Sequence, residues 1–372
     1  MWSEVPLDQL GYVSRGRSRH RPRNDPVLYG GVHPFIQTGD VKAAGLRITT
    51  HSQTYGEAGL AQSRLWPENT LCITIAANIG DTALLSYPAC FPDSIIGFVG
   101  DERKCDVRFV KYCFDMVQER MRMVSQGATQ DNLSQDKLLR FGIPCPPVET
   151  QTAIGDMLSA YDDLIETNRR RIALLEESAR LLYREWFVNL RFPGCSNMSS
   201  SADVPHGWKR CSLGDLATLH YGKALKDANR IAGHVLVYGS SGVVGEHNRA
   251  LVDGPAIIVG RKGNVGSVYY SHGPCFPIDT VYFVRGNEVS YFLYLLLETM
   301  DFISSDSAVP GLNRSHAYRL SVTCPSKGAL YRFEKVVAPI FEQIHVLQET
   351  NKKTATARDE LLPKLMSGAI RV

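Results

Sequence analysis

The stretch from Glu149 to about Trp186 constrains the fold more than any other part of the sequence. Its apolar residues recur at alternating steps of three and four, which is a heptad seam, and the polar Asn168 interrupts the seam once. At about 1.5 Å per residue, a helix of this length is a rod on the order of 50 Å long. The sequence therefore predicts a spacer helix. Its seam residues are Ile154, Leu158, Tyr161, Ile165, Asn168, Ile172, Leu175, Ala179, Leu182 and Trp186.

Two structures would produce this seam. One is a single amphipathic helix packed on its own domain, and the other is a coiled coil with a second helix. The length of the stretch favours the coiled coil. A second, less apolar seam surrounds Asn351, and a pairing of Asn168 with Asn351 would fix the register of the two helices. The residues of this second seam include Phe341, Ile344, Asn351, Leu362 and Leu365.

The composition excludes a membrane protein and a disulfide-rich secreted protein. The 372 residues are 44% hydrophobic and 21% charged, with a net charge of +3, which suits two or more folded domains. The nine cysteines form no C-x-x-C pair, which argues against a disulfide framework or a zinc site and for a reducing compartment. We find no signal peptide and no apolar run of the roughly 20 residues that a membrane span needs. We therefore expect a cytoplasmic protein without membrane contact and without a metal site.

The sequence contains a diverged internal repeat, in which the segment 66–95 is echoed by 252–281. Any single match arises easily by chance, but an ordered series indicates two copies of one domain. The period is far longer than that of solenoid repeats, so two domains are expected. The matched positions are Leu10 and Gly16 with Leu216 and Gly222, Asn78 and Gly80 with Asn264 and Gly266, Cys90–Pro92 with Cys275–Pro277, Asn132 and Ser134 with Asn313 and Ser315, and Pro144 with Pro325.

Proline, glycine and serine clusters set the predicted domain boundaries. Pro144, Pro146 and Pro147 prevent a continuous helix before the first seam, and a Ser-, Gly- and Pro-rich linker follows it. Short apolar runs broken by turns predict strand-rich domains, so the fold class is α+β with two mixed domains and an internal pseudo-two-fold repeat. The predicted order is a first domain at 1–147, a long helix at 148–191, a linker at 192–204, a second domain at 205–325 and a second long helix at 326–372.

Basic loops at matched places in the two copies predict a nucleic-acid surface. The window 14–24 carries five arginines and no acidic residue, and its Gly16 matches Gly222, which two lysines follow. A basic run is often only a solvated loop, but two such loops favour contacts to phosphates or to guanine. The tip GRKGNVGS at 260–267 lacks the order of a phosphate-binding loop, so a solvated turn and a phosphate contact explain it equally well. These candidates are Arg15, Arg17, Arg19, Arg21, Lys223, Lys226, Arg261, Lys262 and Asn264.

No catalytic constellation is evident in the sequence. The ten histidines are dispersed, and neither H-E-x-x-H nor G-x-S-x-G occurs. The [DN]-P-P-[YF] loop of an amino-methyltransferase is also missing, since only CPPV stands at 145–148. These observations favour a binding and assembly protein that carries out no reaction itself.

The motifs and their order resemble the DNA-specificity subunit of type I restriction–modification systems. The resemblance covers nearly the whole chain, as a variable domain, a long helix, a second variable domain and a second helix. From the third of its motifs, Arg314 joins the candidates for DNA contact. The motifs are GRKGNVGSVYY (260–270), CFPIDT (275–280), VPGLNRSHAYRL (309–320) and PPVETQTAI (146–154).

The resemblance implies a fold, partners and a division of labour. Each variable domain would read one half of a split site on double-stranded DNA, and the two helices would form an antiparallel coiled coil. Two modification (methyltransferase) subunits would dock on this chain, and restriction (motor-nuclease) subunits would join them. S-adenosylmethionine, ATP and Mg²⁺ are then expected on the partner subunits and not on this chain. The alternatives are a coiled-coil scaffold without DNA readout and an enzyme with an unfamiliar site.

Overall fold

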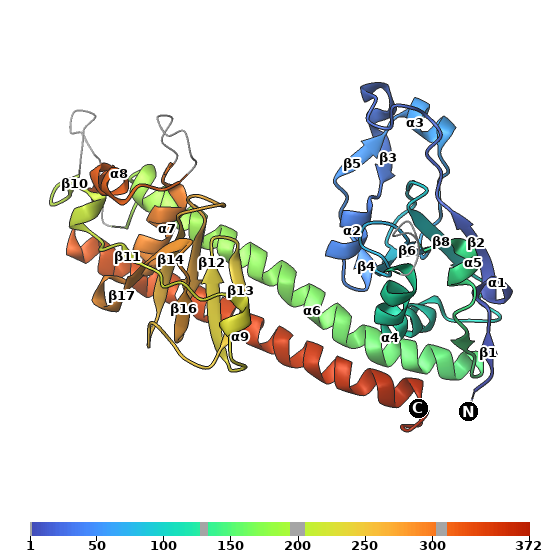
Figure 1. The fold of residues 1–372 in the computed structure, drawn as a ribbon. Helices are drawn as coiled ribbons and strands as arrows, with labels where there is room; N and C mark the ends of the chain where they lie inside the picture. The colour runs from blue at the N-terminus through green and yellow to red at the C-terminus, as the bar shows by residue number, and fades with distance from the viewer. Residues whose placement is uncertain (1, 127–132, 194–204, 303–310) are drawn as a thin grey trace. The chain divides into compact units, whose positions relative to one another are not determined.

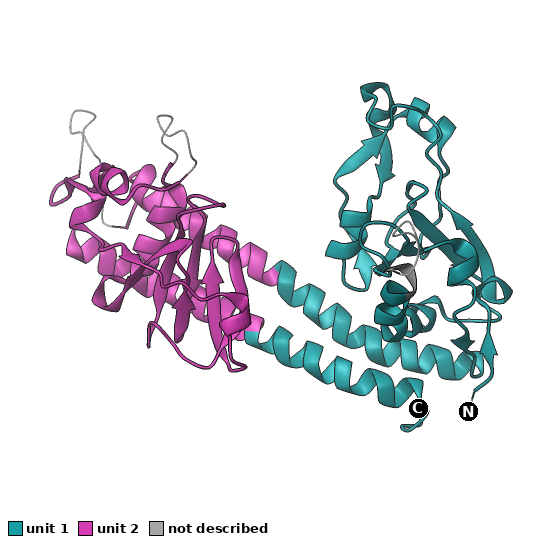
Figure 2. Ribbon diagram, in the orientation of Figure 1, with its two compact units in different colours: residues 1–170, 349–372 teal, residues 171–348 magenta. Residues whose placement is uncertain are grey.

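The computed structural model describes residues 2–126, 133–193, 205–302 and 311–372. The chain divides into two compact units, shown in Figure 2: unit 1 contains residues 1–170 and 349–372, and unit 2 contains residues 171–348. Two long helices, α6 (Val148–Tyr183) and α9 (Lys327–Met366), contribute residues to both units.

Unit 1 is built on a five-stranded sheet with the strand order β2-β8-β6-β7-β4. The strands are β2 (Gly11–Arg15), β4 (Arg47–Ile48), β6 (Leu71–Thr74), β7 (Thr82–Leu85) and β8 (Ile95–Gly100). Two further pairs join β1 (Glu4–Val5) to β9 (Ile143–Pro144) and β3 (Tyr29–Phe35) to β5 (Gln53–Tyr55). The helices that precede α6 are α1 (Leu7–Leu10), the 3-10 turn η1 (Pro26–Leu28), α2 (Thr38–Ala43), α3 (Glu57–Gln62), α4 (Val107–Gln126) and α5 (Gln135–Leu138).

Alternation along β6 divides the core of unit 1 into two layers. Leu71 and Ile73 belong to the apolar cluster that includes α4 and α6, and Cys72 between them belongs to the cluster on the other face. This is the two-residue period of a strand that is buried on both faces. Figure 1 shows α4 between the sheet and α6, so the first part of α6 is a structural element of unit 1.

Unit 2 contains a four-stranded sheet, β11-β17-β14-β15, and a three-stranded sheet, β13-β12-β16. The strands of the first are β11 (His220–Tyr221), β14 (Ala256–Gly260), β15 (Val268–Ser271) and β17 (Val281–Arg285). Those of the second are β12 (Val235–Gly239), β13 (Gly242–His247) and β16 (Cys275–Pro277), and β10 (Lys209–Ser212) pairs with β18 (Ser321–Cys324). The helices are the π-turn η2 (Arg184–Val188), the 3-10 turns η3 (Leu213–Asp215), η4 (Asp227–Asn229) and η5 (Gly286–Glu288), α7 (Tyr291–Thr299) and α8 (Arg314–Arg319).

Backbone hydrogen bonds confirm the predicted internal repeat. The amide of Gly80 donates to the carbonyl of Thr74, and the amide of Gly266 donates to that of Gly260, each over 2.9 Å. The φ angles of Gly80 and Gly266 are 83° and 80°, a region that favours glycine. The two matched glycines therefore close the same turn, between β6 and β7 in unit 1 and between β14 and β15 in unit 2.

Strand pairing corrects one of the motif matches. Trp66 pairs with Ala89, and its counterpart Val252 pairs with Cys275. The structural counterpart of Cys275 is therefore Ala89, so the predicted match of Cys90–Pro92 with Cys275–Pro277 is wrong by one residue. The reason is that equivalent positions in the two copies are defined by the hydrogen-bond register of their strands. Identical residues in the two sequences need not occupy equivalent positions.

A second correction concerns the helices that precede the long ones. Ser134 caps α5, and Asn313 caps α8, each by accepting a backbone N–H. Ser134 is therefore the counterpart of Asn313, and its predicted match with Ser315 is wrong by two residues. Pro144 lies within β9, whereas Pro325 follows β18. The predicted match of Pro144 with Pro325 is therefore also wrong by two residues. The predicted match of Asn132 lies outside the described residues.

The two long helices run side by side in opposite directions, as predicted (Figure 1). In unit 1, Ile154 of α6 and Leu365 of α9 share one core cluster, and in unit 2 Ala179 shares a cluster with Phe341. Both structures that the seam allowed therefore occur together, because the helices pair and each also packs on a domain core. Among the seam residues, Ile154, Leu158, Ile165, Asn168, Phe341, Ile344, Leu362 and Leu365 are buried, and Tyr161, Ile172, Leu175, Leu182 and Asn351 are partly buried.

A polar contact lies within this helix pair. Asn168 is 2% exposed, and its Nδ2 donates to Oδ1 of Asn351 over 2.9 Å. Nδ2 of Asn351 donates to the carbonyl of Ile165 over 3.3 Å. The two asparagines thus satisfy each other where an unpaired buried amide would be costly.

Each long helix is also joined to its unit by one equivalent side chain. In unit 1, Oε1 of Gln151 accepts the amide of Asp106 over 3.1 Å, directly before α4. In unit 2, Glu334 accepts the amides of Tyr291 and Phe292, at the start of α7. Both contacts satisfy free N–H groups at a helix N-terminus.

Candidate nucleic-acid interface

Unit 2 carries a cluster of arginine and tyrosine side chains at the edge of its larger sheet. The guanidinium carbon of Arg314 lies 4.8 Å from the ring centre of Tyr221, and that of Arg261 lies 5.4 Å from the same ring. Arg261 also lies 5.7 Å from the ring of Tyr282. These are cation–π distances. The Tyr221 ring is 53% exposed, so the cluster presents a flat aromatic face and two cations to solvent.

Backbone hydrogen bonds bring three segments together to form this cluster. The amides of Arg261 and Lys262 both donate to the carbonyl of Thr280. The amide of Leu312 donates to the carbonyl of Arg261 over 2.8 Å, which places α8 and its Arg314 beside the β14–β15 turn. Three stretches far apart in the sequence thus meet at one surface.

A hydrogen bond and two aromatic rings hold the Arg261 side chain in place. Its Nη2 donates to the carbonyl of Asp279 over 2.8 Å, while its Nε is buried without a hydrogen-bond partner among the described residues. Burial raises the pKa of the neighbouring Tyr282 phenol to about 12, so this ring stays neutral. Arg261 therefore presents a positive charge in a fixed position, and not all of its N–H groups are used in hydrogen bonds within the described residues.

The other candidates of unit 2 are solvent-exposed. Lys223 and Lys226 lie in the loop that follows β11, and Lys262 and Asn264 lie in the β14–β15 turn. The backbone carbonyl of Asn264 accepts the hydroxyl of Ser267 over 2.9 Å, which leaves the Asn264 side chain at the surface. We find no ion pair for the three lysines within the described part of the chain.

The arginine window of unit 1 splits into two groups. Arg15, Arg17 and Arg19 are exposed and have no carboxylate partner among the residues that the structure describes. Arg21 instead donates to the carbonyls of Ser18 and His20, each over 2.8 Å. Arg23, in the same window but not among the candidates, makes two 2.9 Å hydrogen bonds to Asp93, which neutralises its charge.

The loop of unit 1 has a defined shape. Oε1 of Gln62 accepts the amides of Arg19 and His20 over 2.6 and 3.0 Å, and the Ser63 hydroxyl donates to the carbonyl of Arg17 over 2.8 Å. These contacts tie the basic loop to α3 and to the residue that follows it. The free arginines are thus presented from an ordered backbone.

Gly16 and Gly222 have the same structural role in the two units. The amide of Gly16 donates to Ile95 O over 2.8 Å, and the amide of Gly222 donates to Val281 O over 3.2 Å. A Cβ on either glycine would meet backbone carbonyl oxygens of the neighbouring segment. The close approach excludes larger residues, which explains why both basic loops begin with glycine.

Some residues of these surfaces were not predicted. In unit 1 the guanidinium carbon of Arg64 lies 4.6 Å from the ring of Tyr12 and 4.5 Å from that of Trp66. Hydrogen bonds from Ser14 and Arg64 lower the pKa of Tyr12, whose ring is 48% exposed. Tyr221 was missed as well. The available signal was an aromatic residue a few positions before the glycine that is matched in the two copies, Gly16 in unit 1 and Gly222 in unit 2, with basic residues nearby.

Three negative findings apply to the described residues. No group of histidine, cysteine and acidic side chains is placed to hold a metal ion, and the eight described cysteines are free thiols. Within the same residues, no helix is long and apolar enough to cross a membrane.

Comparison with known proteins identifies relatives along the whole chain. A model of the type I restriction modification DNA specificity domain matches residues 1–177 and 205–353. The specificity subunit of the type I restriction enzyme MjaIX from Methanocaldococcus jannaschii is 26% identical, with coverage of 100% of this chain and 94% of that protein. The specificity subunit of the HindI enzyme from Haemophilus influenzae is 24% identical, with 99% coverage of each. The crystal structure of the S subunit from M. genitalium has a similar fold, with a TM-score of 0.62 at 18% identity over 98% of this chain and 96% of that one.

Proposed function

The chain belongs to the type I restriction–modification DNA specificity family, and we propose that its two units each read one half of a bipartite DNA target. As a specificity subunit, it supplies DNA recognition to an enzyme complex and is itself non-catalytic. What the family alone leaves open is which surfaces touch DNA and how the two units share the target.

The observation that carries the proposal is a pair of equivalent surfaces with different side chains. Gly16 and Gly222 make the same backbone contact in each unit. Next to it, unit 1 presents Arg15 and Arg17, whereas unit 2 presents Tyr221 and Lys223 at the equivalent places. A shared scaffold with different exposed groups suits two half-sites of different sequence.

The exposed groups divide into two kinds of contact. Lys223, Lys226, Lys262 and the free arginines of unit 1 are exposed cations, which suits phosphate contacts that position the duplex. Arg261 and Arg314 are packed on aromatic rings, and Asn264 is an exposed amide. A held guanidinium binds guanine bidentately, and an amide binds adenine. We assign base reading in unit 2 to these three side chains.

The proposal includes the assembly that the family implies. Two modification subunits dock on this chain and carry out methyl transfer from S-adenosylmethionine, and restriction subunits join them with ATP and Mg²⁺. The site of action is the cytoplasm, where the target DNA is found. For the domains, we keep the predicted bounds as part of this proposal, with reading domains at 1–147 and 205–325 and the long helices at 148–191 and 326–372.

An exchange experiment tests the division of the target. Residues 1–147 are replaced by those of a relative, which leaves both long helices in place. Genome-wide methylation mapping is expected to show one altered half-site and one unchanged half-site. A chimera in which both halves change would contradict separate reading. A complex that assembles but binds DNA without sequence preference would favour the alternative of a scaffold without readout.

A further inference from the structure

The sequence E-T-N followed by two basic residues occurs twice, once in each long helix. It stands as ETNRR at 166–170 in α6 and as ETNKK at 349–353 in α9. Its asparagines are Asn168 and Asn351, which hydrogen-bond to each other. A register contact accounts for the asparagines, but it gives no role to the basic residues that follow them.

The matched basic residues lie around a local pseudo-two-fold axis. Equivalent residues of two antiparallel helices contact each other where such an axis passes, so the contact between Asn168 and Asn351 marks its position. Arg169 and Lys352, the next residues in the two copies, are both exposed and line the same hollow of about 340 Å³. These two cations therefore lie on one side of the helix pair.

The hollow lies within unit 1, between the two helices and the segment 45–49, which contains β4. Arg47 lines it from β4, and its Nη1 donates to the side chain of Asn69 over 2.9 Å. A Cβ on Gly45 would lie 3.6 Å from Nη1 of Arg169, which places this guanidinium beside the same segment. Cations from β4, α6 and α9 thus line one hollow.

Positive charge is in excess in this hollow, because five basic and three acidic side chains line it. Two of the acidic groups are already neutralised, in the ion pairs Asp162–Arg358 and Glu166–Arg170. The third, Asp163, is exposed and has no cationic partner among the described residues. One free carboxylate therefore remains beside the three other cations.

These three cations are free to bind a ligand. Arg47 and Arg169 have no carboxylate partner in the described part of the chain. Lys352 pairs with Glu349 over 2.7 Å, but the two side chains are 60% and 42% exposed, and a surface pair of this kind contributes little. A phosphate group, which accepts hydrogen bonds on several oxygens, would satisfy the three cations together.

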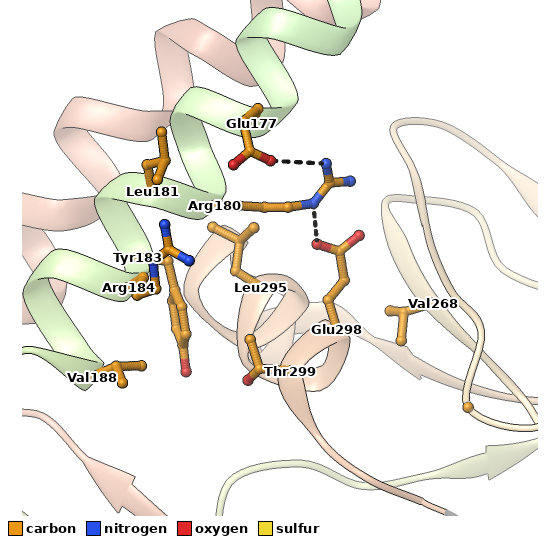
Figure 3. A pocket seen from close by; sticks show the side chains of 11 residues that line it. Glu177, Arg180, Leu181, Tyr183, Arg184, Val188, Val268, Leu295, Glu298 and Thr299 are labelled. Atoms are coloured by element: carbon orange, nitrogen blue, oxygen red, sulfur yellow. Dashed lines mark hydrogen bonds and ion pairs between the residues drawn. The ribbon is translucent and has the colours of Figure 1, made fainter. Parts of the chain in front are cut away.

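Other arginines near the end of α6 do not share these properties. Arg180 is neutralised by Glu177 and Glu298, as Figure 3 shows. Arg184 is exposed, but the equivalent residue at the end of α9 is Ser367, which carries no charge. These two arginines lack the duplication that marks the asparagine motif.

A basic motif that is kept in two otherwise diverged copies fits a ligand with the same chemistry on both sides. The surfaces proposed to read DNA differ between the units, since Arg15 of unit 1 has Tyr221 as its counterpart in unit 2. Two half-sites differ in their bases, but the phosphate backbone of DNA is the same at every sequence. The two strands of a duplex are also related by two-fold symmetry, which matches a pseudo-two-fold pair of cations.

We propose that Arg47, Arg169 and Lys352 bind backbone phosphates of the DNA spacer, the segment between the two half-sites that neither unit reads. The inference rests on the proposed function for the bipartite DNA target. The place of the motif in the chain supports the spacer as its ligand, because α6 leaves unit 1 after Arg170 and α9 enters unit 1 at Glu349. The spacer is then held without regard to its base sequence.

A paired substitution tests the proposal in the assembled complex with its modification subunits. Arg169→Gln together with Lys352→Gln removes two cations at exposed helix positions, where glutamine keeps the helix propensity. The slope of log K against log salt is expected to become shallower by about 2, and the affinity for the cognate site to fall about tenfold. The same fold-loss is expected on DNA with an altered half-site, because no base contact is removed. Arg184→Gln is the matched control and should change neither quantity.

Uncharged methylphosphonate linkages, placed in the spacer that methylation mapping defines, test where the contact lies. The wild-type complex is expected to lose affinity on this DNA, and the double variant to lose little more, because its missing cations no longer contact those linkages. A double variant with the wild-type salt slope would overturn the proposal, as would spacer linkages that weaken both complexes equally. An altered number of bound modification subunits with an unchanged slope would also overturn it, since a partner carboxylate would then be the occupant. A wild-type complex without sequence preference would instead contradict the proposed reading function, and the spacer linkages would still test the motif.

Discussion

The two surfaces that we propose to read DNA are built on the same backbone contacts but use their arginines differently. In unit 1, Arg15, Arg17 and Arg19 extend into solvent from an ordered loop. In unit 2, Arg261 and Arg314 lie against the exposed ring of Tyr221. A free arginine samples many rotamers and is fully hydrated. An arginine stacked on a ring has already lost part of its rotamer freedom and part of its hydration before a ligand binds.

Under the proposed function, this difference would let one fold recognise two different half-sites. The hydrogen bonds of Gly16 and Gly222 position the loops in both units, so the backbone geometry is shared. The contact chemistry then depends on a few side chains that surround the shared glycine. We expect unit 2 to discriminate bases through its preorganised cluster, and unit 1 to depend more strongly on phosphate contacts near its loop.

Removing the shared contact should have the largest effect. In Gly16→Ala or Gly222→Ala, the new Cβ meets backbone carbonyl oxygens that cannot move aside, so each unit should lose about 3 kcal/mol of stability. Gly39→Ala and Gly254→Ala are the controls, because a Cβ meets nothing within 4 Å there. Thermal unfolding monitored by calorimetry would show the loss. Unchanged unfolding in one unit would mean that the two loops are not equivalent.

The stacked cluster should give the next largest effect. Arg314→Ala removes a cation that lies 4.8 Å from the Tyr221 ring, and binding to the cognate site should weaken by about 1–3 kcal/mol, with relaxed preference at one base of the unit 2 half-site. Binding to a set of single-base variants of the target by the assembled complex measures this. A uniform loss across all variants would reassign Arg314 to phosphate contact.

The acid stability of the units should also differ. Burial and the adjacent His345 lower the pKa of His272 from 6.5 to about 4, and the two rings stack at 4.4 Å. Protonation therefore favours the unfolded state: the contribution of His272 is complete above about pH 6.5 and is lost as the pH falls toward 4. His272→Asn should flatten this part of the stability–pH curve, whereas the exposed His234→Asn should not. A curve that is identical for the two variants would exclude His272 as the cause.

Neutralising the free arginines of unit 1 should have the smallest effect. Arg15→Ala and Arg17→Ala remove exposed cations, so each should lower the slope of log K against log salt by about 1 and leave sequence preference intact. Arg23→Ala is the matched control, because Asp93 already neutralises that arginine. If affinity and slope do not change, the loop is a solvated surface.

The sequence predicts the helices and the repeat because both depend on short-range patterns. Heptad spacing reports the buried side of a helix, and the glycines that close the turns at Gly80 and Gly266 follow from local backbone geometry. The sequence match of Cys275 with Cys90 was wrong by one residue. The true counterpart depends on the pairing of Cys275 with Val252, and residue identity alone does not reveal that pairing. The arginine–tyrosine cluster was only half predicted for the same kind of reason. Arg261, Arg314 and Tyr221 come from three separate segments, and only tertiary structure brings them together.

Paired charges set a similar limit on prediction. Arg23 belongs to the same basic window as Arg17, yet Asp93 neutralises it from a distant part of the chain. Asn168 and Asn351 were matched by position in the repeat, and the structure places them within 2.9 Å of each other. A polar residue inside an apolar heptad seam predicts a buried polar partner on the other helix. A charged residue on a surface loop does not predict whether it is paired.

Unit 1 is built from two separate segments of the chain, residues 1–170 and 349–372. This has a consequence for the order of folding. Leu362 and Leu365 belong to the same core cluster as Phe98 and Phe109, so the first domain to leave the ribosome lacks part of its interior until the last helix has been made. Unit 2 is a single continuous segment, 171–348, and can close earlier. We therefore expect unit 2 to be able to close before unit 1 is complete, and a chain that ends before Leu362 to lack part of the core of unit 1.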